Sequence, residues 1–125
     1  MITTISSPIG ELHVVPNGRE WKILAVSAQL SGVVSSEDGV ARVELEIESG
    51  GNPSVHVLLL PLFADQVGVG VRVEVNLSAA LGVGDRDVNE LASVVRGLPD
   101  IPLPAGARFA INSNLSGALT FTIED

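Results

Sequence analysis

The chain has two histidines, His13 and His56, and histidine is the side chain best suited to acid–base chemistry at neutral pH. A Ser-His-Asp arrangement needs one of them beside a nucleophile and a buried acid. Neither lies in a nucleophile-like motif, and each stands between two aliphatic residues of a predicted strand. Alternation along a strand predicts that both point outward from the sheet, as surface or interface histidines. With no cysteine, the chain also has no thiolate nucleophile, no disulfide and no Cys-ligated zinc site.

Three glutamates, Glu44, Glu46 and Glu48, alternate along one predicted strand. Neighbours on one strand face lie roughly 6.5 to 7 Å apart. Such an even, solvated row does not resemble the matched acid and base that catalysis needs. It is either a solvated face or an acidic strip that meets Arg or Lys on another protein, where it would aid encounter rate and register more than affinity.

Oxygen-bearing side chains also cluster at Asp85, Asp87, Asn89 and Glu90, around Arg86. The cluster lacks the D-x-D-x-D-G spacing and the distal glutamate of a calcium loop. The Gly-Val-Gly segments at 68–70 and 82–84 lack the further Gly, Lys or Ser/Thr of a phosphate-binding loop. We therefore expect no catalytic, cofactor-binding or metal-ligating residues, no cofactor and no enzyme activity.

Aromatic residues are too few for a sugar-stacking platform. Trp21 is the only tryptophan, there is no tyrosine, and the phenylalanines are Phe63, Phe109 and Phe121. We expect Trp21 to anchor the core or a sheet edge.

The strongest structural pattern is a β-hairpin from Arg42 to Leu60. Val43, Leu45 and Ile47 alternate with charged residues, and the sequence Gly-Gly-Asn at 50–52 supplies the backbone freedom that a tight turn needs. The pattern predicts one face for a core and one face for water or a partner.

Further strands are predicted at 9–15, 21–30, 69–77, 107–111 and 119–123. The long connections at 31–39 and 78–104 favour a jelly-roll or Greek-key path, so the predicted fold is an all-β, antiparallel two-sheet sandwich. Residues 85–96 fit either one short helix, because apolar residues recur there at helical spacing, or an irregular excursion that leads into the proline-rich segment 98–104. Residues 1–8 are predicted to be an N-terminal arm, frayed or exchanged with a neighbour, and residues 9–125 a single β-sandwich domain.

Composition and charge limit the classes of partner that the chain can bind. The net charge of −8 and a pI near 4.5 disfavour nucleic acid. The longest apolar stretches fall short of the about 20 residues that a membrane-spanning helix needs, and the N-terminus lacks the features of a secretory signal. The mean hydropathy of +0.41 is high for a small soluble chain, which indicates that other subunits cover apolar area. We expect a homo-oligomer, a trimer or a dimer.

The order of motifs in residues 16–125 resembles that of small virion proteins of tailed bacteriophages. The likeness consists of a P-x-G-x-x-W-x-x-x-x-V strand, an R-x-x-x-x-I-x-x-G hairpin and an L-P-A-G segment before a late strand. The matching residues are Pro16, Gly18, Trp21, Val26, Arg42, Ile47, Gly50, Leu103, Pro104, Ala105 and Gly106.

This resemblance implies a jelly-roll-like β-sandwich that serves as a capsid decoration or cement protein, or builds another part of the virion. The major capsid protein would be its partner, and the chain would be assembled in the host cytoplasm and lie on the capsid surface. No enzyme activity comes with the resemblance, and no binding residues are carried over from it. The alternative is a glycan-binding or adhesive β-sandwich module of a tail fibre or a bacterial surface.

Overall fold

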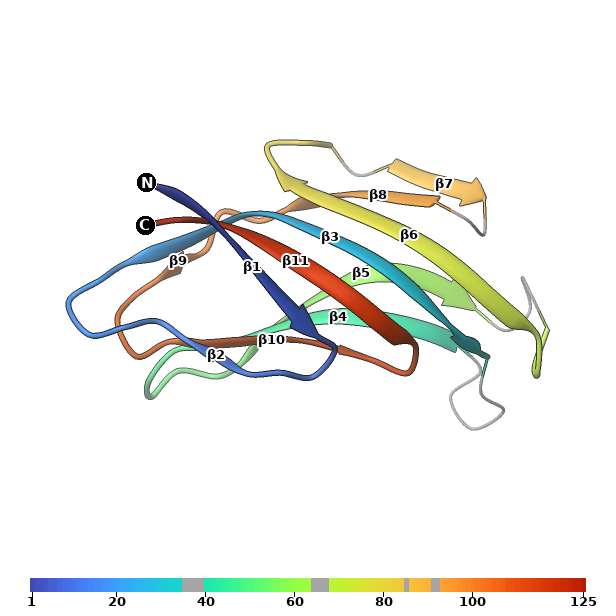
Figure 1. Cartoon of the computed structure of the whole chain (residues 1–125), viewed down its shortest axis with the longest axis horizontal. Helices are drawn as coiled ribbons and strands as arrows, with labels where there is room; N and C mark the ends of the chain where they lie inside the picture. The colour runs from blue at the N-terminus through green and yellow to red at the C-terminus, as the bar shows by residue number, and fades with distance from the viewer. Residues whose placement is uncertain (35–39, 64–67, 85, 91–92) are drawn as a thin grey trace.

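The chain folds into two β-sheets that pack face to face (Figure 1). The computed structural model describes residues 1–34, 40–63, 68–84, 86–90 and 93–125, with the backbone alone at 40, 61–63 and 86–90. In spatial order, the large sheet contains β1 (Ile2–Pro8), β11 (Ser116–Glu124), β3 (Trp21–Val33), β6 (Arg72–Leu81), β8 (Ser93–Leu98) and β7 (Arg86–Glu90), and β9 (Pro102–Leu103) pairs with β3. The small sheet contains β2 (His13–Val14), β10 (Arg108–Ser113), β4 (Val40–Glu48) and β5 (Val55–Phe63).

The strand order confirms the predicted antiparallel β-sandwich. All strand pairs of the described residues are antiparallel except β6 and β8, which are parallel. The chain crosses between the sheets after β1, β2, β3, β5, β9 and β10. These crossings place residues that are distant in sequence on opposite inner faces, where they bury each other.

The predicted hairpin is confirmed as β4 and β5, which run from the pair Val40 and Phe63 to the pair Ile47 and Val55. Gly51 adopts a positive φ of 77° in the turn, and the Asn52 amide donates to the Ser49 carbonyl at 3.0 Å. Local turn chemistry and alternation therefore specify this unit together.

The core contains mainly aliphatic residues that alternate along the strands. In β6 the buried residues are Val73, Val75, Leu77 and Ala79, and they face the small sheet. The predicted strand 69–77 was wrong at its start, since Val69 and Val71 are exposed. Gly68 and Gly70 adopt positive φ and turn the chain there, so β6 begins only at Arg72.

Between residues 85 and 96 the described residues form strands β7 and β8 rather than a helix. Val94 and Leu98 are buried, with Arg96 between them on the same face of β8. Strand β8 pairs with β6 along its whole length. The backbone hydrogen bonds of this pairing outweigh the local preference for a helix that the spacing of the apolar residues indicated.

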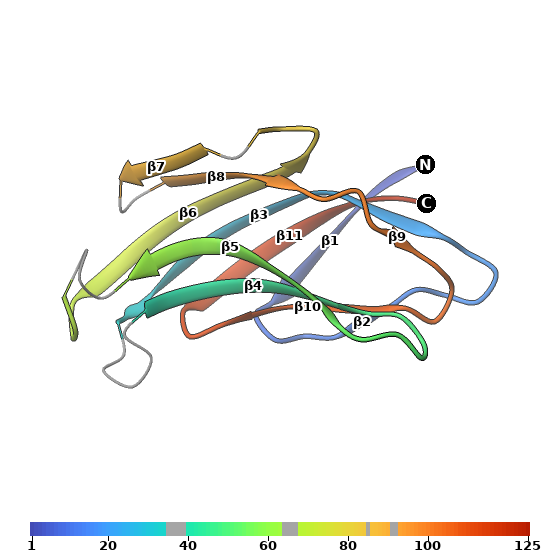
Figure 2. The same ribbon diagram turned by 180° about the vertical axis from the view of Figure 1, so that it is seen from behind.

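Residues 1–8 lie as strand β1 at the rim of the large sheet. They pair with β11 from Ile2 opposite Glu124 to Pro8 opposite Ala118, and Ser7 is buried. The two termini lie side by side in both views (Figures 1 and 2). The next predicted strand, 9–15, is reduced to the two residues of β2. In the proline-rich segment, β9 pairs with the first residues of β3.

Candidate functional site

The outer face of the small sheet carries the three glutamates as an acidic strip, which we define as Glu44, Glu46 and Glu48 of β4. Their strand-mates Val43, Leu45 and Ile47 are buried, so the alternation of β4 directs the carboxylates outward. The sheet therefore presents the acidic strip on its outer face.

Neighbouring strands hold two of these carboxylates in place. His56 Nδ1 of β5 is in hydrogen-bond contact with Glu44 Oε1, and Arg42 Nη1 lies 3.8 Å from Glu44 Oε2. Asn112 Nδ2 of β10 donates to Glu46 Oε2 at 2.7 Å. These contacts restrict the side chains before any partner arrives, which lowers the entropy cost of binding.

His56 lies where alternation predicted it, exposed on the outer face of β5. Its position beside Glu44 follows from strand register, because His56 lies opposite Glu46 in the β4–β5 ladder. The structure thus places His56 within the acidic surface.

The prediction for His13 was wrong, because its side chain points inward. Its ring stacks on Phe109 with centroids 5.3 Å apart and meets Phe121 edge-on at 5.6 Å. The next residue, Val14, takes the outward position instead. The buried Nε2 of His13 has no hydrogen-bond partner among the described residues. Burial among aromatic rings makes His13 a packing residue.

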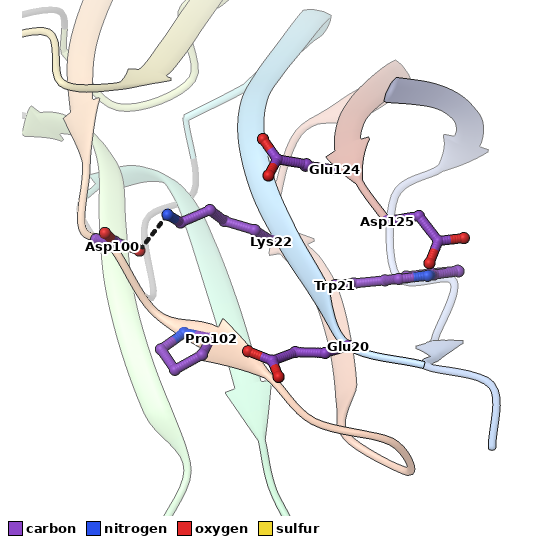
Figure 3. Close-up of a pocket in the computed structure, with 7 residues that line it drawn as sticks. All are labelled: Glu20, Trp21, Lys22, Asp100, Pro102, Glu124 and Asp125. Atoms are coloured by element: carbon purple, nitrogen blue, oxygen red, sulfur yellow. Dashed lines mark ion pairs between the residues drawn. The ribbon is translucent and has the colours of Figure 1, made fainter. Parts of the chain in front are cut away.

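A second surface feature is a hollow of about 440 Å³ where the chain termini meet the start of β3 (Figure 3). We call it the terminal hollow. Its lining residues come from three segments that lie far apart in sequence: Glu20, Trp21, Lys22, Asp100, Pro102, Glu124 and Asp125.

Charged groups in the terminal hollow are partly paired. Lys22 Nζ lies 3.2 Å from Asp100 Oδ1, and Arg19 forms an ion pair with Asp125. Trp21 is the predicted anchor: it packs against the core beside Phe109, with ring centroids 6.2 Å apart. The hollow therefore combines carboxylates with one aromatic wall, a combination suited to a cationic group.

A third feature is a more open hollow of about 370 Å³ at the side of the sandwich, lined by Val57, Leu58, Val83, Arg96, Gly97, Leu98 and Pro99. Here Arg96 Nη2 of the large sheet donates to the Leu58 carbonyl of the small sheet at 3.2 Å. The contact ties the two sheets together where β5 forms the edge.

No group of three metal-ligating side chains comes together among the described residues. The cluster considered at 85–90 is not tested by this, since Asp85 and the side chains of residues 86–90 lie outside the described residues. The Phe63 side chain and the acidic residues of the 31–39 loop also lie outside them. Within the described part of the chain, no helix is long and apolar enough to cross a membrane.

Comparisons with protein-family models, with curated proteins and with solved structures find no match to this chain. The likeness to phage virion proteins therefore stays a prediction from sequence motifs.

Proposed function

We propose that this protein is a non-enzymatic structural protein of a phage virion, a capsid decoration or cement protein that binds the outer surface of the head. The observation that carries the proposal is the acidic strip on the outer sheet face, where His56 contacts the Glu44 carboxylate and Asn112 donates to that of Glu46. In this role the strip meets Arg and Lys side chains of the major capsid protein at the contacts between capsomers.

An acidic surface of this kind is suited to binding a repeating lattice such as a capsid. One exposed ion pair contributes only about 0.2–1 kcal/mol, and salt screens it. A preformed acidic face on a chain with a net charge of −8 still speeds encounter with a basic surface and selects its register. Many linked contacts on one particle then give strong retention from weak individual contacts.

Sedimentation of particles tests the proposal directly. Particles are pelleted from a phage lysate, and mass spectrometry gives the copy number of this protein relative to the major capsid protein. Hundreds of copies per particle support a decoration role. A few copies per particle contradict it in favour of the neck, tail or fibre, and absence from particles refutes the virion assignment.

Charge reversal on the acidic strip should weaken particle binding. We expect the double variant Glu46→Lys/Glu48→Lys to bind roughly tenfold less well at low salt, because each reversal turns an attraction of about 0.2–1 kcal/mol into a repulsion. The measurement is co-sedimentation of the purified variant with undecorated heads at increasing salt concentration.

The matched control is Glu11→Lys/Glu74→Lys, which makes the same change in net charge at exposed positions outside the acidic strip. It should bind as the unmodified protein does. Equal weakening by both double variants would show that net charge, and not the acidic strip, governs binding.

The terminal hollow favours the second candidate, a glycan-binding or adhesive module, because Trp21 lines it together with several carboxylates. This candidate predicts saturable sugar binding that changes the fluorescence of the only tryptophan. A glycan array followed by titration of the fluorescence distinguishes the two functions, since a cement protein gives no such signal.

A further inference from the structure

Strand β1 forms one rim of the large sheet, and its outer edge carries free backbone groups. At its start, the Met1 amino group donates to the Asp125 carbonyl at 3.0 Å and the Asp125 amide donates to the Met1 carbonyl at 2.9 Å. Bonded and non-bonded pairs alternate along an antiparallel ladder. The N–H and C=O groups of Ile2, Thr4 and Ser6 therefore point away from β11, toward the open edge.

The side chains of β1 do not protect this edge. Native edge strands are commonly blunted by lysines, inward charges, bulges or prolines. Residues 2–7 contain none of these charges or prolines, the proline of β1 is its last residue, Pro8, and the register with β11 is unbroken from Ile2 to Pro8. Ile2 is 64% exposed and Ile5 is only partly buried against the core. The edge is thus neutral, straight and partly apolar.

The surface beside the middle of β1 is also neutral, and the nearest exposed carboxylate of β11, Glu124, lies opposite Ile2 at the far end of the strand. On the outer face of the large sheet, β11 presents Thr120 and Thr122 next to β1, and β3 follows with Ser27 and Gln29. Most of the surface of a chain with a net charge of −8 would repel a second copy. At the β1 edge, two copies can approach without bringing like side-chain charges together.

We propose that a second copy of this chain pairs with β1, edge to edge and antiparallel, across a two-fold axis that passes at Ile5. In this register Ile5 lies opposite Ile5 of the partner subunit, and Thr4 lies opposite Ser6 of the partner subunit. The outward backbone groups of Thr4 and Ser6 then form ladder hydrogen bonds, and Ile2 is covered by Pro8 of the partner subunit. The two large sheets become one continuous sheet.

The edges of the small sheet do not offer the same opportunity, and at one of them β2 is only two residues long. Strand β5 forms an edge of the small sheet, but Arg96 already donates to the Leu58 carbonyl there. Strand β5 also contains Pro61, which has no amide hydrogen to donate. The dimer proposed at β1 stands apart from the proposed virion role, because it is a property of the purified chain.

The test is the mass of the purified protein by light scattering during gel filtration. The unmodified protein should have the mass of a dimer, twice 12.9 kDa. Thr4→Lys should reduce it to the monomer mass, because a lysine on each edge strand brings charges together across the axis. Ser27→Lys introduces the same charge at an exposed position of β3, which lies inside the sheet and not at its edge. This variant should stay a dimer.

A monomeric unmodified protein, a trimer, or a dimer that Thr4→Lys leaves intact would overturn the proposal. Loss of the dimer in both variants would place the contact on the sheet face and overturn it as well. If Thr4→Lys fails to fold, a cysteine variant at Ile5 still tests the dimer by a second measurement.

The chain has no cysteine, so Ile5→Cys introduces a single thiol. Directly opposed residues of a non-bonded antiparallel pair have Cα atoms about 4.5 Å apart, within the range that a disulfide spans. Mild oxidation should therefore link two Ile5→Cys chains covalently, whereas Ser27→Cys chains should remain separate. Failure of Ile5→Cys to cross-link, or equal cross-linking of both variants, would contradict the register.

Discussion

Replacing Gly117 with alanine should lower the free energy of unfolding by about 3 kcal/mol or more. Gly117 is the second residue of β11 in its pairing with β3, opposite Leu30, and has a φ of +152° that L-residues rarely adopt. An added Cβ would overlap the Gln29 carbonyl oxygen and lie 3.1 Å from the Leu30 Cα. Both obstacles are backbone atoms of the neighbouring strand, so no side-chain rotation relieves them.

Thermal and urea unfolding followed by circular dichroism measure this loss, and the expected fall in Tm is about 10 °C or more. The control is Gly50→Ala, which lies in the β4–β5 turn without a positive φ and with nothing within 4 Å of the new Cβ. Gly32→Ala should fall between them, since its Cβ would meet the movable Leu115 Cδ2 at 2.9 Å. A Gly117→Ala protein as stable as Gly50→Ala would show that β11 can shift away from β3 at little cost.

The β4–β5 hairpin could be predicted from sequence because everything that specifies it is local. Alternation places Val43, Leu45 and Ile47 on one face, and the Gly-Gly-Asn turn sets the register. The fold class followed from the repetition of such strands. Strand β8 was ambiguous because Arg96 interrupts its apolar face, and because its parallel partner β6 is separated from it in sequence by β7.

The candidate site was less predictable for two physical reasons. Strand β2 has only two residues, too few to show from sequence which of them points inward. The sequence therefore could not show that His13, rather than Val14, packs on Phe109 and Phe121. The terminal hollow is built from residues 20–22, 100–102 and 124–125, which only the pairing of β3 with β9 and β11 brings together. By contrast, the acidic strip lies on one strand and was visible in the sequence.

Truncation of Phe109 to alanine should lower the free energy of unfolding by about 3–5 kcal/mol. Phe109 is fully buried in β10 and meets Phe121 of β11 edge-on, with centroids 5.1 Å apart and planes at 85°. The two rings come from opposite sheets, so their contact holds the layers of the sandwich together. His13 and Trp21 pack on the same ring, and they cannot fill the cavity without leaving their own strands.

Urea unfolding of Phe109→Ala, Phe121→Ala and the double variant measures both the loss and the coupling between the rings. The coupling should be about 0.5–1.5 kcal/mol, the range for edge-to-face aromatic pairs. Phe109→Leu keeps most of the volume and should lose less than about 1.5 kcal/mol. Trp21 is the only tryptophan and packs on Phe109, so its emission should shift in Phe109→Ala but not in the exposed control Ser27→Ala. If Phe109→Ala loses less than about 1 kcal/mol of stability and the Trp21 emission is unchanged, the sheets close over the missing ring. The position of Trp21 in the terminal hollow would then not depend on Phe109.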